Sequence, residues 1–277
     1  TKPPNEKGRP TDRLFRNDIT IDENGKPQCT FVDVTESAGI AAFGYGMGVA
    51  TGDFNRDGFI DIYVTNYGSN QFWRNNGDGT FTDVTKESQA DSPGWGTSAT
   101  MVDINRDGLL DLYVCNYVDF NYKNHRDCFE DKSGKKIYCG PGSFPTQPDR
   151  LFLNLGDGTY KDISASSQIA RRYGAALGIV CADFNRDGYV DIYVANDANP
   201  NNLWINQKNN TFKDESVRQG CAVNDIGVPE GSMGVDAADY DKDGRDDLFM
   251  THISQETNTL YRFDTKLRFF HDRSEQT

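Results

Sequence analysis

Four short acidic segments of the sequence combine residue types and a spacing that can bind a hard cation. Three of them read Asp-x-Asn-x-Asp-Gly-x-x-Asp, and the fourth has Asp in place of Asn at position 3. Side chains at positions 1, 3 and 5 converge inside a tight loop, position 7 offers its backbone carbonyl, and position 9 closes the shell. Glycine at position 6 permits the sharp turn. The expected ligands are Asp53, Asn55, Asp57, Phe59, Asp61, Asp103, Asn105, Asp107, Leu109, Asp111, Asp183, Asn185, Asp187, Tyr189, Asp191, Asp239, Asp241, Asp243, Arg245 and Asp247.

The identity of the ion follows from the donor atoms. Every expected ligand atom is oxygen, and the loops contain no histidine or cysteine, which favours Ca²⁺ over zinc or copper. Mg²⁺ fits less well because it holds its waters and seldom accepts an all-protein cage. A single acidic turn is equally well explained as a solvated loop, but four copies in one nine-residue register favour metal sites. We therefore expect about four Ca²⁺ ions as the cofactor.

The charge of the chain has its source in the same loops. The 277 residues include 42 Asp and Glu against 29 Lys and Arg, a formal net charge of -13. Positions 1, 3, 5 and 9 of the four loops hold 13 of these carboxylates, which equals the formal excess of negative charge, and four bound Ca²⁺ ions would leave a charge of -5. A chain this acidic is a poor partner for nucleic acid or for an anionic membrane surface. No apolar run is long enough for a membrane-spanning helix, so membrane insertion is not expected.

The residues that follow each loop exclude an EF-hand. An EF-hand carries a bidentate Glu at position 12 and lies between helices. Position 12 is here Val64, Val114, Val194 or Met250, inside β-branched and aromatic runs that are typical of strands. The loops are therefore expected to connect the two strands of β-hairpins.

The loops recur with the period of a propeller. Their starts are 50, 80 and 56 residues apart, which favours a β-propeller or a solenoid. A second hairpin pattern recurs between them, so each unit has four short strands with the loop between the first two. We predict an all-β fold, a β-propeller with four-stranded blades at about 46–86, 97–164, 174–216 and 232–273. Residues 12–17 and 31–35 supply the last two strands of an N-terminal half-blade, so another part of a longer protein, or another chain, is expected to complete the ring.

Two groups of residues carry a resemblance to a known family. The acidic loops beside Gly-Asp-Gly-Thr-Phe-x-Asp-Val-Thr hairpins resemble FG-GAP/VCBS repeats, as in integrin α-chain propellers. The segments Tyr138–Pro141, Asp149–Asn154 and Asp33–Ile40 are similar to the cartilage-acidic-protein (ASPIC/UnbV) family. The resemblance covers about 12–277, after an N-terminal extension at 1–11. It implies a secreted or surface-exposed, Ca²⁺-bound propeller of about seven blades with an added C-terminal ASPIC region, which the present chain lacks together with the last blades.

Cysteines and a long insert add two expectations. The six cysteines suit an oxidising compartment and allow 15 pairings, of which Cys128–Cys139 is favoured because it closes an otherwise floppy loop. Cys115 and Cys181 lie on expected strands and are equally well explained as buried free thiols. The loop belongs to an insert at about 117–148, on the face opposite the acidic loops. Its many aromatic residues indicate either a recognition surface or a lid packed onto the propeller.

Three functions remain open. The preferred one is a secreted, extracellular or periplasmic calcium-binding module that binds a protein or glycan through the face opposite the loops. The second is a carbohydrate-active lyase or glycosidase, since 29 acidic residues lie outside these ligand positions; however, the three histidines show no metal-ligand spacing and no nucleophile-elbow motif is present. The third is a structural subunit of a larger complex, assembled with another chain. No catalytic residue is assigned.

Overall fold

The structure is a computed structural model, and it describes residues 12–40, 42–253 and 256–274. The expected extension at 1–11 lies outside the described residues. The elements are β1 (Phe15–Ile21), β2 (Pro27–Asp33), β3 (Gly46–Gly52), β4 (Asp61–Gly68), β5 (Gln71–Asn75), β6 (Phe81–Asp83), β7 (Gly94–Val102), β8 (Asp111–Asn116), β9 (Cys128–Phe129), β10 (Lys136–Ile137), η2 (Pro141–Ser143), β11 (Arg150–Asn154), β12 (Tyr160–Asp162), η3 (Ile169–Arg171), β13 (Ala176–Ala182), β14 (Asp191–Asn196), β15 (Asn202–Asn206), β16 (Phe212–Asp214), β17 (Ser232–Ala238), β18 (Asp247–His252), β19 (Thr259–Asp264) and β20 (Phe269–Asp272).

The strands form antiparallel four-stranded units in chain order. β13–β16 and β17–β20 are separate four-stranded sheets, whereas β3–β6 and the unit β7-β8-β11-β12 are joined into one sheet through a short β4–β7 pairing. In every unit an acidic loop connects the first strand to the second. The all-β propeller fold predicted from the sequence is confirmed, and the total number of blades in a ring stays a prediction.

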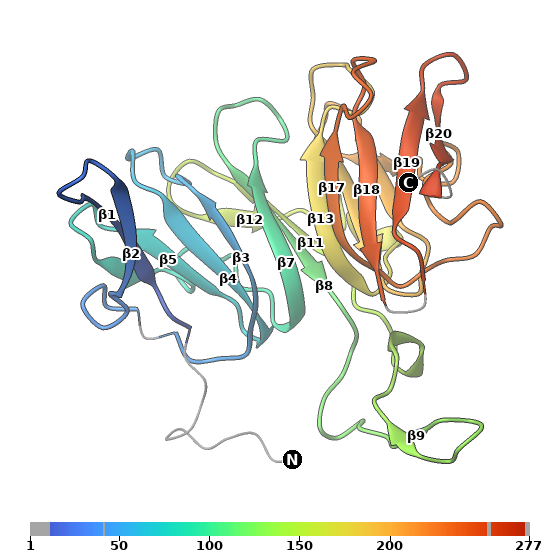
Figure 1. The fold of residues 1–277 in the computed structure, drawn as a ribbon, viewed down its shortest axis with the longest axis horizontal. Helices are drawn as coiled ribbons and strands as arrows, with labels where there is room; N and C mark the ends of the chain where they lie inside the picture. Colours follow the sequence, from blue (N-terminus) through green and yellow to red (C-terminus); the bar gives the residue numbers. More distant parts are fainter. Residues whose placement is uncertain (1–11, 41, 254–255, 275–277) are drawn as a thin grey trace.

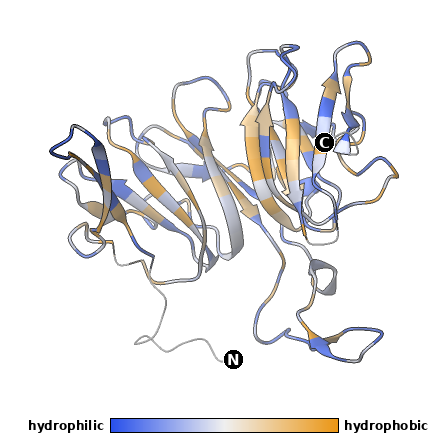
Figure 2. Cartoon of the chain, viewed as in Figure 1, coloured by the Kyte–Doolittle hydropathy of each residue, from blue (hydrophilic) through white to orange (hydrophobic). Residues whose placement is uncertain are grey.

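Successive units are arranged in an arc (Figure 1). Their first strands β3, β7, β13 and β17 contact one another in this order. Apolar side chains fill the space between neighbouring sheets, and Figure 2 shows the hydrophobic colour gathered on the strands and the hydrophilic colour on the loops. Each interface therefore buries residues of two units, which is how short four-stranded sheets gain a core.

A repeated tyrosine anchors the second strand of the first three units. Tyr63, Tyr113 and Tyr193 are fully buried, and the hydroxyl group of Tyr193 donates a 2.6 Å hydrogen bond to the carbonyl oxygen of Cys221. Phe249 occupies this position in the fourth unit. It is 43 % exposed, because the described residues form no further four-stranded unit after β20 that would cover it.

The N-terminal hairpin differs in detail from the sequence expectation. Its strands β1 and β2 pair from Phe15–Asp33 to Ile21–Pro27, so they extend further than the expected strands at 12–17 and 31–35. The reason is a tight turn in which the carboxylate of Asp22 accepts the N–H groups of Asn24 and Lys26 (both 2.9 Å), while Gly25 takes a φ of 76°. The turn lets residues 18–21 and 27–30 continue the pairing of the two strands.

The insert lies between β8 and β11 and contains the short hairpin β9–β10 (Figure 1). A disulfide joins Cys128 to Cys139, as predicted, with a Cα–Cα distance of 5.2 Å. Cys115 is a buried free thiol, and Cys181 is free and partly buried. Among the described residues, no helix is long and apolar enough to cross a membrane.

Candidate metal centres

The four acidic loops share one backbone conformation. Position 4 adopts a left-handed φ near 60°, as at Arg56 (61°) and Lys242 (60°), and the glycine at position 6 has a φ of 82–88°. Glycine is the residue that reaches this region at no steric cost, whereas the residue at position 4 needs support from its surroundings. That support comes from position 1: the carboxylate of Asp53 accepts the N–H groups of Asp57 (3.0 Å) and Gly58 (2.8 Å).

Each loop turns its polar side chains toward one another. The N–H group of position 7 donates to the carboxylate of position 5, as from Phe59 to Asp57 (2.9 Å), and the amide of Asn55 contacts the same carboxylate (2.8 Å). The same pattern recurs in the second and third loops. Positions 1, 3 and 5 named from the sequence are thus brought together, while position 7 donates its N–H group to the carboxylate of position 5.

Position 9 ties each loop to its own sheet. The carboxylate of Asp111 accepts one N–H group from Ile104 (3.0 Å), inside the loop, and another from Asn154 (2.8 Å), at the end of the third strand. Asp61, Asp191 and Asp247 are buried and make equivalent pairs of contacts. Because position 9 joins three strands of the unit, its carboxylate has a structural role as well as a place among the expected ligands.

Burial also changes the acidity of these groups. Loss of solvent raises the pKa of Asp61 to about 6 and those of Asp111 and Asp191 to about 7, and it raises the pKa of Asp247 as well. The neighbouring carboxylates raise these pKa values further. They stand at positions 1 and 5 in the first three loops and at positions 3 and 5 in the fourth. A divalent cation between them would oppose both effects, because it favours the ionised form of every carboxylate around it.

The fourth loop provides the test of whether a cation fits. Carboxylate oxygens of Asp239, Asp241 and Asp247 lie within 4.8 Å of one another. Oδ1 of Asp239 is buried and has no hydrogen-bond partner among the described residues. Three converging carboxylates with a buried, unpaired oxygen are the donor set that a hard divalent cation requires. These residues fit Ca²⁺.

The structure reveals contacts between loops that the sequence reasoning missed. The basic residue at position 4 of one loop lies close to the glycine at position 6 of the next loop. A Cβ atom added at Gly108 would lie 3.7 Å from the guanidinium of Arg56, and one added at Gly188 would lie 3.4 Å from that of Arg106. The guanidinium of Arg106 also lies 5.3 Å from the ring centre of Tyr189. Arginine at position 4 of three loops was the feature of the sequence that could have indicated this link.

An asparagine at the end of the third strand makes a second link. The side-chain amide of Asn154 donates to the carbonyl of Phe54 in the preceding loop (2.9 Å), and Asn206 donates likewise to Ile104 (2.8 Å). Both amides also bind the carbonyl before position 9 of their own loop. Neighbouring loops therefore form one continuous polar network along this edge of the arc.

Comparison with known proteins agrees with this geometry. The FG-GAP-like repeat family matches residues 53–114, 137–194 and 183–250. The chain belongs to this family. Cartilage acidic protein 1 of Xenopus tropicalis is 36 % identical over 110 residues, which are 39 % of this chain and 16 % of that protein. The human protein of the same name is 34 % identical over 123 residues, 42 % of this chain and 17 % of that one.

These matches confirm the resemblance noted in the sequence, although the chain matches only about a sixth of the length of these curated relatives. Among solved structures, an Agrocybe aegerita lectin described as recognising non-reducing terminal N-acetylglucosamine has a TM-score of 0.40 and 18 % sequence identity. That similarity covers 80 % of this chain and 50 % of the lectin chain.

An aromatic cluster lies at the end of the sheets opposite the acidic loops, and the insert supplies part of it. The ring of Tyr67 packs edge-on against Trp95 (5.6 Å between centroids), and Phe120 packs against both and against Phe144 (5.4 Å). The hydroxyl of Tyr67 donates to the carbonyl of Phe120 (3.2 Å). The stem of the insert therefore packs onto the first two units, as the lid interpretation requires.

The tip of the insert leaves a hollow open to solvent. Its volume is about 810 Å³, and its walls combine aromatic rings with the basic residues Arg126 and Lys136. Tyr138 at its rim is fully exposed, and Phe129 and Ile137 are about half exposed. The packing of the stem agrees with the lid interpretation, and recognition of a ligand by the exposed aromatic and basic tip stays a prediction.

One cluster in the fourth unit resembles catalytic groups and lacks their geometry. Nε2 of the buried His252 lies 3.3 Å from Oγ of Ser232 and 3.5 Å from Oε2 of Glu230. In a catalytic triad the nucleophile and the acid contact different ring nitrogens, whereas here both contact Nε2 and Nδ1 has no partner among the described residues. His252 stands at the strand position that an asparagine occupies in each of the other three units, so a structural role accounts for it.

Proposed function

We propose that this chain is part of an extracellular calcium-binding propeller that acts as a binding or assembly module for a protein or glycan. The observation that carries the calcium assignment is the fourth loop, where three carboxylates converge on a buried, unpaired oxygen of Asp239. The other three loops have the same backbone conformation and the same position-9 contacts. When bound, Ca²⁺ would supply positive charge that holds the carboxylates of each loop together.

The residues themselves determine what calcium would stabilise. Positions 1 and 5 fold the loop, position 9 fastens it to the third strand, and the asparagine network connects it to the next unit. For extracellular modules the expected affinity is on the order of 10⁻⁴–10⁻³ M per site. At 10 mM Ca²⁺ each site would then add about 1–3 kcal/mol to the free energy of unfolding.

Isothermal titration and thermal melts test this assignment. We expect saturable Ca²⁺ binding and a melting temperature that falls sharply in excess EDTA. Asp107→Asn, at position 5 of the second loop, should remove one site, whereas Asp78→Asn should not. Asp78 is a suitable control because it is an exposed turn aspartate that accepts the N–H of Thr80 (3.0 Å), which asparagine can also accept. A melt that EDTA does not change would refute the structural role of the metal.

Secretion is part of the proposal because of the disulfide. Cys128–Cys139 lies in an exposed insert, and such bonds form and persist in oxidising compartments. The face that carries this insert is the proposed ligand-binding face. It is at the opposite end of the sheets from the acidic loops, as the positions of the β9 hairpin and the β19–β20 turn show in Figure 1.

Binding to immobilised glycans and to purified extracellular-matrix proteins tests the ligand-binding face. Tyr138→Ser removes the fully exposed ring at the rim of the hollow, and we expect at least a tenfold loss of affinity, or about 1.4 kcal/mol. Leu155→Ser, a half-exposed residue after β11 at the other end of the sheets, is the control and should have no effect. Equal binding by wild type and Tyr138→Ser would refute this assignment, and product release from a bound glycan would favour the enzyme alternative.

A further inference from the structure

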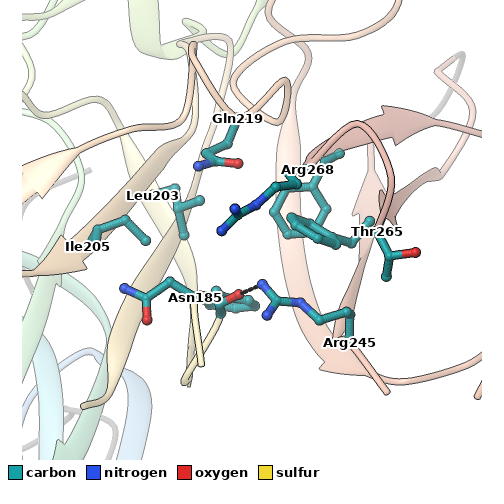
Figure 3. A pocket seen from close by; sticks show the side chains of 10 residues that line it. Asn185, Leu203, Ile205, Gln219, Arg245, Thr265 and Arg268 are labelled. Atoms are coloured by element: carbon teal, nitrogen blue, oxygen red, sulfur yellow. Dashed lines mark hydrogen bonds between the residues drawn. The ribbon is translucent and has the colours of Figure 1, made fainter. Parts of the chain in front are cut away.

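A small pocket separates the third and fourth units at the acidic-loop end of the sheets. Its volume is about 210 Å³, and its apolar wall includes Leu203 and Ile205 of β15. Figure 3 shows the guanidinium groups of Arg245 and Arg268 directed into this space from two different loops, with the amide of Gln219 above them. An overall acidic chain thus places two cations in one partly apolar cavity.

Both arginines are departures from the repeat. Position 7 of the acidic loop is Phe59, Leu109 or Tyr189 in the other units and Arg245 here. In the turn between the third and fourth strands, the left-handed residues are glycines in the first two units and Lys208 (φ 66°) and Asn210 (φ 62°) in the third, and Arg268 has a φ of 60° in the fourth. A left-handed backbone is less favourable for arginine than for glycine, and the fourth unit holds Arg268 in this conformation beside the pocket.

Among the described residues, neither guanidinium group forms an ion pair. No carboxylate oxygen of these residues lies within 4.0 Å of a side-chain nitrogen of Arg245 or Arg268, whereas Arg150 and Arg262 each pair with an aspartate. Arg186, from the adjacent loop, lies against Gly244 and adds a third positive charge beside Arg245. Asp183 and Asp243 offset part of this charge without forming an ion pair with Arg245. Positive charge is therefore concentrated at the pocket.

A structural role explains only part of this arrangement. In the second and third units an asparagine amide binds the carbonyl of the preceding loop, but Phe263 stands at that position in the fourth unit. Arg245 replaces the missing amide by donating to the carbonyl of Phe184, and its guanidinium lies 4.4 Å from the ring centre of Phe263. This contact uses one of the five N–H groups of Arg245 and none of those of Arg268.

We propose that this pocket binds the carboxylate of a small organic acid. The planar forks of Arg245 and Arg268 match the two oxygens of a carboxylate, and the amide of Gln219 offers a further hydrogen bond. Leu203 and Ile205 would contact the apolar part of the ligand. The volume admits a group of only a few heavy atoms beyond the carboxylate, because a water molecule already takes about 30 Å³ of liquid volume.

Titration of the isotope-labelled protein with sodium butyrate, followed by NMR chemical shifts, tests the proposal. Saturating Ca²⁺ and constant ionic strength keep the acidic loops in one state. Butyramide, which is neutral and of the same shape, is the ligand control. Arg268→Asn reproduces the residue type of the third unit at an exposed turn, so it should fold normally and should weaken butyrate binding at least tenfold. Arg16→Gln removes the same charge on the β1 strand, far from the pocket in Figure 1, and should have no effect.

We expect saturable shifts at Gln219 and Leu203 with butyrate, and none with butyramide. Equal binding of butyrate by wild type and Arg268→Asn, or tighter binding of sulfate than of butyrate, would overturn the proposal. These results do not depend on the calcium assignment, which is tested separately by the EDTA melts.

Discussion

Asp149 is a buried acid at a position where the other units have asparagine. Its side chain is 1 % exposed and accepts hydrogen bonds from the N–H of Asn116 and from the hydroxyl of Tyr113, both at 2.8 Å. Asn70 and Asn201 make the same contact with the end of the second strand in their units. Burial raises the pKa of Asp149 to about 7. Replacement by asparagine should therefore stabilise the protein at neutral and alkaline pH.

The sign and size of the effect follow from proton binding. The folded state holds the proton up to about pH 7, whereas the unfolded state releases it near pH 4, so the stability associated with Asp149 is full in acid and is lost as the pH rises through 7. The difference between these pKa values corresponds to a cost of about 4 kcal/mol above pH 7. Asparagine removes this cost, but the hydroxyl of Tyr113 must find another acceptor, which costs about 1 kcal/mol. We expect a net stabilisation of about 2–3 kcal/mol at pH 8.

Urea unfolding of wild type and Asp149→Asn between pH 5 and 8.5, at one Ca²⁺ concentration, measures this difference. Subtracting the two curves cancels the titration of the carboxylates in the acidic loops, since both proteins contain them. Asn70→Asp is the reciprocal control, because it places a carboxylate at the buried position of the first unit and should destabilise the protein with the same pH dependence. A difference in unfolding free energy that does not change with pH, or a less stable Asp149→Asn at pH 8, would refute the reasoning.

Two further predictions concern the tyrosine anchors and the insert. Tyr193→Phe should cost about 1–2 kcal/mol of unfolding free energy, because it leaves the buried carbonyl of Cys221 without the hydroxyl that donates to it at 2.6 Å; equal denaturant midpoints for the two proteins would contradict this. Cys128→Ser combined with Cys139→Ser should leave the melting temperature of the propeller nearly unchanged but speed proteolysis within 117–148, since the bond closes a loop outside the sheets. A large fall in the melting temperature would show instead that the insert supports the core.

The repeat made most of the fold predictable. Every acidic hairpin loop has the same nine-residue register and is followed by β-branched and aromatic residues. This pattern is sufficient to place the four-stranded units and the insert between β8 and β11. The disulfide was predictable because Cys128 and Cys139 are close in sequence within a long loop. The extent of β1 and β2 was not, because it depends on the Asx turn at Asp22 rather than on the pattern of strand residues.

The candidate sites were predictable to different degrees. The ligand positions of the loops follow from local spacing, so the sequence could name them. The dual role of Asp111, which accepts an N–H group from Asn154, depends on pairing between residues 43 apart and becomes visible only in the folded unit. The same is true of the reach of Arg106 toward Gly188, which connects two loops that no local pattern brings together.

Departures from the repeat are the positions at which this chain can differ from a generic propeller. A repeated residue is explained by the interface that every unit must form, whereas a departure needs a reason of its own. Asp149 replaces a neutral amide with a buried acid, and Arg245 and Arg268 replace apolar and turn residues with cations that form no ion pair within the described part of the chain. The insert replaces a short connection with an exposed aromatic surface. The buried acid of Asp149 has a cost in stability that the pH dependence would reveal, whereas the pocket and the insert are the two departures for which we propose ligand recognition.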